Sequence, residues 1–105
     1  MTTTMKIWKK NKINVAVQVL PEAGEKIKYE LVDAAIEAIK QTGLKHQVCP
    51  FETVVECNYD ELSMLLESVH TACRKAGTEK MLTNLKIQVN FTEDVAIEDK
   101  MEKYR

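Results

Sequence analysis

A chain of 105 residues with 45% hydrophobic and 30% charged side chains has the length and composition of one globular domain. Its 15 basic and 16 acidic side chains nearly cancel, which argues against a nucleic-acid-binding protein, because such proteins usually carry a basic excess or stripe. No apolar run approaches the roughly 20 residues of a membrane span, and the three cysteines lack the C-x-x-C spacing of a zinc site. We therefore expect a reduced, cytoplasmic protein that neither enters membranes nor binds nucleic acid.

Residues 1–12 are polar and basic apart from Trp8, and they lack the apolar run of a signal peptide. We interpret them as an N-terminal extension, either loose or docked through Trp8, on a single domain over residues 13–105. The first strand is predicted at residues 13–20 (INVAVQVL), and its side chains alternate between two faces: Val15, Val17 and Val19 on one, and Ala16, Gln18 and Leu20 on the other. Both faces are largely apolar, which favours a central strand.

Two amphipathic helices of similar plan are predicted. The first covers about residues 27–42 and ends at Gly43, which suits a left-handed cap. The second begins at Asn58 or Asp60, both good N-cap residues, and ends at Gly77. Each helix carries one apolar stripe and one charged face, so each is expected to cover one side of a sheet.

Between the helices, residues 44–49 and 51–57 are predicted as two short strands that meet near Pro50. Proline cannot donate a ladder hydrogen bond, so it suits the corner between them. A fourth strand is predicted at residues 81–91, again with two alternating sets of side chains: Leu85, Ile87, Val89 and Phe91 inward, and Asn84, Lys86, Gln88 and Asn90 outward. A short amphipathic helix is expected within residues 92–105.

This order, βαββαβ plus a C-terminal helix, predicts an α+β, ferredoxin-like sandwich with an antiparallel sheet. Both long helices would cover one sheet face and leave the other open. Because the open face is apolar at Ala16 and Leu20, we expect sheets from two or more subunits to pack together through it.

One set of polar residues is predicted to bind a small molecule: Gln18, Glu52, Thr53, Glu56, Asn84 and Lys86. In such a sheet the first strand lies between the third and fourth, so Gln18 is expected beside Glu56 on one flank and beside Asn84 or Lys86 on the other. Amides and a carboxylate together suit a heteroaromatic ligand with an exocyclic amine. Alternatively, these side chains hydrogen-bond one another across a subunit interface, or Gln18 is simply solvated. Thr53 and Glu56 have odd spacing, so a regular strand would place them on opposite faces.

No catalytic or metal-binding constellation is predicted. His46 and His70 lie in different elements, and there is no glycine-rich phosphate loop. The three cysteines, Cys49, Cys57 and Cys73, are interpreted as small hydrophobic side chains rather than reagents.

Several segments in order resemble the family of small thiamine-binding, YkoF-like proteins: 15–21 (VAVQVLP), 32–37 (VDAAIE), 42–44 (TGL), 50–56 (PFETVVE), 59–62 (YDEL) and 85–87 (LKI). The resemblance implies a ferredoxin-like subunit, dimers that pair into tetramers through their sheets, and non-catalytic binding of thiamine or its hydroxymethylpyrimidine moiety as a ligand rather than a cofactor. Two alternatives stay open. One is a structural or regulatory interaction module without a ligand; the other is an enzyme on a small nitrogenous substrate, with Glu56 as general base.

Overall fold

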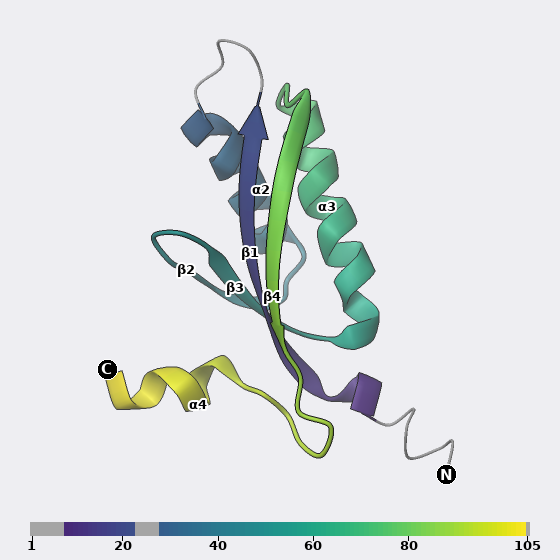
Figure 1. Ribbon diagram of the computed structural model, residues 1–105, viewed down its shortest axis with the longest axis vertical. Helices are drawn as coiled ribbons and strands as arrows, with labels where there is room; N and C mark the ends of the chain where they lie inside the picture. The colour runs from purple at the N-terminus through teal and green to yellow at the C-terminus, as the bar shows by residue number, and fades with distance from the viewer. Residues whose placement is uncertain (1–7, 23–27, 105) are drawn as a thin grey trace.

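A four-stranded antiparallel sheet runs through the computed structural model, which describes residues 8–22 and 28–104 (Figure 1). The elements follow in chain order: η1 (Trp8–Lys10), β1 (Lys12–Glu22), α2 (Lys28–Gln41), β2 (Lys45–Val48), β3 (Thr53–Asn58), η2 (Tyr59–Glu61), α3 (Leu62–Lys75), β4 (Lys80–Gln88), α4 (Ile97–Met101) and η3 (Glu102–Tyr104). The strand order is β2-β3-β1-β4, with every neighbouring pair antiparallel. The predicted ferredoxin-like α+β fold is confirmed. The first seven residues of the predicted N-terminal extension, and residues 23–27 of the predicted connection, lie outside the described residues.

The alternation of β1 decides which side chains enter the core. Ile13, Val15 and Val17 point toward α2 and α3 and are almost fully enclosed. The helices supply the opposite side of the core with four side chains that are likewise buried: Leu31, Ile39, Leu65 and Val69. Figure 1 shows both helices on the same side of the sheet, as the sequence predicts. The pattern of burial follows from the two periodicities alone, because each element presents one apolar face.

The predicted helix boundaries are held by capping residues. Asn58 and Glu61 form a capping box, in which the Asn58 side chain accepts from the Glu61 N–H and the Glu61 carboxylate accepts from the Asn58 N–H, each at 2.9 Å. At the other ends, Gly43 and Gly77 have positive φ values of 76° and 107°. Glycine adopts this left-handed region without steric cost, so both helices end where the sequence indicates.

The fourth strand ends earlier than predicted. It stops at Gln88, and two of the side chains expected to point inward, Ile87 and Phe91, are exposed. The reason is a side-chain turn, in which Asn90 Oδ1 accepts from the N–H of Thr92 at 2.9 Å. Phe91 instead meets the Trp8 ring edge-on at 5.1 Å, and Tyr59 meets the same ring at 5.2 Å. Trp8 therefore docks against the end of the sheet, one of the two outcomes expected for it.

The C-terminal segment crosses to the sheet face that α2 and α3 leave open. Val95 N–H donates to the Lys12 carbonyl at 2.8 Å, and Ile97 beyond it is buried. In Figure 1 this segment curls below the β2–β3 hairpin, away from the two long helices. The open face is thus covered at one end only. Within the described ranges, no helix is long and apolar enough to cross a membrane.

Candidate functional site

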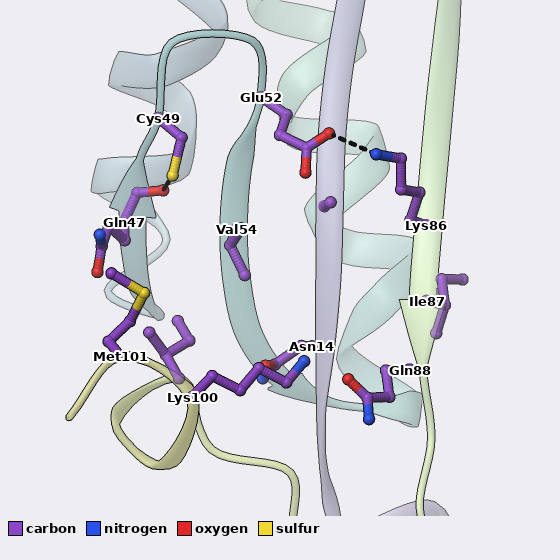
Figure 2. Close-up of a pocket in the computed structure, with 12 residues that line it drawn as sticks. Asn14, Gln47, Cys49, Glu52, Val54, Lys86, Ile87, Gln88, Lys100 and Met101 are labelled. Carbon is purple, nitrogen blue, oxygen red and sulfur yellow. Dashed lines mark hydrogen bonds and ion pairs between the residues drawn. The ribbon is translucent and has the colours of Figure 1, made fainter. Parts of the chain in front are cut away.

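A pocket of about 300 Å³ lies on the open sheet face, between the strands and α4 (Figure 2). Twelve residues line it: Asn14, Ala16, Gln47, Cys49, Glu52, Val54, Lys86, Ile87, Gln88, Ile97, Lys100 and Met101. Ala16 is the Cα partner of Val54 on β3 and of Lys86 on β4, so the floor crosses three strands. This volume is at the lower end of the range for small-molecule sites, about 300–1,000 Å³.

One end of the pocket carries an ion pair that spans β1. Lys86 Nζ lies 3.2 Å from Glu52 Oε1; Lys86 comes from β4, and Glu52 immediately precedes β3 on the other side of β1 (Figure 2). Ala16 lies between the two strands, and its single methyl group leaves room for the two long side chains to meet above it. The Lys86 side chain is 80% exposed, so the pair adds little to folding stability. Both charges are therefore accessible to a ligand.

The other end of the pocket is closed by the C-terminal segment. Figure 2 shows Lys100 and Met101 extending from α4 toward the sheet. Glu56 holds this segment in place: its Oε1 accepts from the Ile97 N–H at 2.9 Å, and its Oε2 lies 3.9 Å from Lys12 Nζ. The Glu56 carboxylate is buried and does not line the pocket. A helix N-terminus favours a carboxylate at this position. Glu56 therefore stabilises the α4 wall of the pocket and does not face the pocket interior.

Of the two neighbours predicted for Gln18, one on each adjacent strand, only the one on β4 lies beside it. Asn84 is its Cα partner on β4, and Asn84 Nδ2 donates to Gln18 Oε1 at 3.2 Å. On the other side the prediction was wrong, because Glu56 is the Cα partner of Asn14, four residues away along β1. That offset is about 13 Å along a strand. Glu52 lies next to Gln18 instead, and both line a hollow that adjoins the pocket.

Thr53 is separated from the other predicted site residues by the sheet itself. It is the Cα partner of Val17, whose side chain faces the helices, and it is buried on that side. No bulge intervenes in the β1–β3 register, so the odd spacing from Glu56 places the two side chains on opposite faces. The structure therefore gathers Gln18, Glu52 and Lys86 but leaves Thr53 out.

Sequence reasoning missed two groups of pocket residues. The first comprises amides on the same face as Gln18, namely Asn14 and Gln88, which are Cα partners of each other. Period-two alternation could have found Asn14, because it shares its parity with Ala16 and Gln18. The second group comes from α4, whose existence is predicted but whose position is not. No local pattern specifies which sheet face a short terminal helix crosses to.

The cysteines and histidines are dispersed. Burial raises the pKa of the Cys57 thiol to about 11, with the Glu61 charge as a smaller cause, and burial also raises the pKa of Cys73. Cys49 lines the pocket, and its Sγ donates to the Gln47 carbonyl at 3.8 Å. His70 is exposed and bonds Thr83 Oγ1 at 2.8 Å. In residues 8–22 and 28–104, no group of three or more His, Cys, Asp or Glu side chains is placed to hold a metal ion.

The chemistry of the pocket combines an apolar floor with a polar rim. Ala16 and Val54 supply the floor, which suits the flat face of a ring. Amide groups at the rim can both donate and accept hydrogen bonds, and Glu52 adds an acceptor with a negative charge. These groups can hold a small polar heterocycle in a defined orientation.

Comparisons with known proteins agree on one family. The profile of the family described as thiamine-binding protein matches residues 15–105. A UPF0045 protein of Clostridium perfringens is 34% identical over 92 residues, which cover 88% of this chain and 96% of the relative. A Bacillus cereus domain of unknown function (DUF77) superposes with a TM-score of 0.84 at 34% identity, covering 90% of this chain and 91% of the other. A candidate thiamine biosynthesis/salvage protein of Thermotoga maritima gives a TM-score of 0.80 at 28% identity, with coverages of 90% and 99%.

The family profile spans nearly the whole described domain, from residue 15 in β1 to the C-terminal segment, and includes all the pocket-lining residues except Asn14. The relatives match over the same length, and the fold of the solved structures is the one described above. This chain belongs to the thiamine-binding protein family.

Proposed function

We propose that this protein binds thiamine or its hydroxymethylpyrimidine moiety in the pocket on the open sheet face, without catalysing a reaction. The observation that carries the proposal is the pocket itself: about 300 Å³, apolar below, and rimmed by amides and the Glu52 carboxylate, in a member of the thiamine-binding family. The three free cysteines fit a reducing compartment, and we place the activity in the cytoplasm.

The charges suggest how the ligand lies. The pyrimidine ring is neutral and flat, so it suits the floor at Ala16 and Val54. The thiazolium ring of thiamine is a cation, which favours the end of the pocket where Glu52 stands. Lys100 lines the opposite end, where a second cation would be repelled. The proposed orientation is therefore pyrimidine toward α4 and thiazolium toward Glu52.

Calorimetric titration of the whole chain with thiamine and with hydroxymethylpyrimidine tests this proposal. Glu52→Gln keeps the shape of the side chain and removes its charge. It should weaken thiamine binding about fivefold to tenfold and leave hydroxymethylpyrimidine binding nearly unchanged. Glu37→Gln, an exposed site on the helix layer, is the matched control. Absence of binding by either ligand at millimolar concentration would contradict the proposal.

We also propose that a second copy of the chain covers the part of the open face that α4 leaves bare. Leu20 and Leu82 are Cα partners there, and they are 47% and 59% exposed. Phe51, at the tip of the β2–β3 hairpin, is 82% exposed. Apolar side chains grouped in this way on one face favour an interface. The ligand would then lie between subunits, in a dimer or a tetramer.

The oligomer is tested by sedimentation velocity. Leu82→Glu places a charge in the proposed contact and should shift the protein toward monomer at micromolar concentration. Met64→Glu changes an exposed apolar residue of α3, on the other side of the molecule, and should leave the oligomer intact. Equal sedimentation of both variants and the unaltered protein would exclude this interface.

A further inference from the structure

The buried amide of Asn14 is only half satisfied. The residue is 4% exposed, and its Nδ2 donates to the Val95 carbonyl at 2.9 Å. A carbonyl oxygen can only accept, so this bond fixes the orientation of the amide and directs Oδ1 elsewhere. Among the residues that the structure describes, Oδ1 has no hydrogen-bond partner. A buried acceptor without a donor is unfavourable and calls for a partner that is not yet in place.

Asn14 stands where the pocket meets the C-terminal segment. It lines the pocket, and Val95, which it bonds, begins the stretch that closes the pocket. Neighbouring hydrogen bonds hold the same stretch: Asp94 Oδ1 accepts from the Lys12 N–H at 2.7 Å, and Glu56 accepts from the Ile97 N–H. The Asn14 side chain therefore links the interior of the pocket to the wall that encloses it.

We propose that Asn14 determines ligand specificity: its Oδ1 accepts a hydrogen bond from an exocyclic amine on the ligand ring, and this contact couples ligand binding to docking of residues 94–101. The inference rests on the proposed function and names the atom that recognises the amine. Because Oδ1 is buried in the arrangement described here, we infer that α4 shifts to admit the ligand ring and docks again against it, so that Oδ1 then faces the ligand amine. One amide then bridges the ligand amine and the Val95 carbonyl.

A donor from the protein is the competing explanation for the unpaired oxygen. The Lys100 ammonium lines the same pocket and has a flexible stem. If Lys100 satisfies Oδ1, the pocket has no reason to prefer an amine on the ligand. The two explanations therefore predict different selectivity between ligands that differ only at that group.

The test compares thiamine with oxythiamine, in which an oxo group replaces the pyrimidine amine. Calorimetry on the unaltered protein should show at least about tenfold tighter binding of thiamine, because the oxo group presents an acceptor to an acceptor. Asn14→Leu, which keeps the branching and the number of side-chain heavy atoms, should bring the two affinities within about threefold. Gln41→Leu, which changes an exposed amide at the end of α2, outside the pocket, should keep the preference.

Hydrogen exchange measures directly how ligand binding affects the docking of residues 94–101. It needs no variant that might fold poorly. At saturating thiamine, the amides of Val95 and Ile97 should exchange about tenfold more slowly than in the free protein, and saturating oxythiamine should protect them less. Equal affinities and equal protection for the two ligands would overturn the inference and leave the proposed function standing. Selectivity without protection would overturn the coupling. Failure of both ligands to bind would instead refute the proposed function.

Discussion

The two faces of the sheet are built from the same strands, yet they differ in what their side chains do. Along β1, Ile13, Val15 and Val17 enter a closed core, while Ala16 and Gln18, at alternate positions, face the pocket side. The helix-covered face is mostly apolar and tightly enclosed, with Thr53 as a buried polar exception. The open face mixes small, amide and charged side chains and keeps a cavity. One strand thus carries folding stability on one side and the candidate binding surface on the other.

This division shows why two carboxylates are tolerated, Glu52 just before β3 and Glu56 within it. Glu52 faces an accessible pocket and pairs with Lys86, whereas Glu56 is buried but accepts a backbone N–H and lies near Lys12. Both charges are compensated, as buried or half-buried carboxylates must be. The helix-covered side of the same strand carries Val55 and Cys57 instead. Charge is confined to the face where a partner for it is available.

Truncation of one large side chain on each face should show the largest contrast. Ile13→Ala removes a fully buried side chain and should lower the free energy of unfolding by about 3 kcal/mol. Leu20→Ala, on the other face of the same strand, should cost less than about 1 kcal/mol in dilute protein, because that side chain is already half exposed. Urea denaturation followed by circular dichroism measures both. Similar losses for the two variants would contradict the division of the sheet.

The buried thiol of Cys57 should make the helix-covered face sensitive to alkali. Its pKa is raised from 9.0 to about 11 in the folded protein, so between these values the unfolded chain releases a proton that the folded chain retains. Stability is therefore intact below pH 9 and declines as pH rises, by about 2 kcal/mol at pH 11 from this group alone. Denaturant melts from pH 8 to 11 measure the slope. Cys57→Ala should flatten it, and an unchanged slope would assign the loss to other groups.

The elements of this fold can be predicted from local patterns, because each has one clear periodicity and a recognisable end. Asn58, Gly43 and Gly77 mark helix ends that the structure confirms. The misplaced end of β4 has a local cause as well, the turn at Asn90, but its signal is weaker than the apolar alternation that continues to Phe91.

The site was less predictable because it depends on register and on a distant segment. A shift of four residues in the pairing of β1 with β3 decides whether Glu56 or Glu52 lies beside Gln18, and alternation alone gives parity rather than register. Thr53 shows the strength of the same rule, since its odd spacing correctly placed it on the opposite face from Glu56. The wall formed by α4 results from contacts more than 40 residues apart in sequence, such as Ile97 with Glu56.

The smallest effect should come from the ion pair at the edge of the pocket, and it has an unusual sign. Lys86 competes with a cationic ligand for Glu52, so Lys86→Gln should strengthen thiamine binding about threefold and leave the neutral hydroxymethylpyrimidine unaffected. The stability of the fold should change by less than about 0.5 kcal/mol, because the pair is largely exposed. Lys80 lies on the same strand as Lys86 but outside the pocket, and it forms a similar ion pair with Glu22. Lys80→Gln breaks that pair and should change neither affinity. Weaker thiamine binding by Lys86→Gln would mean that the lysine contacts the ligand itself, and the open face would then recognise anionic rather than cationic groups at this end.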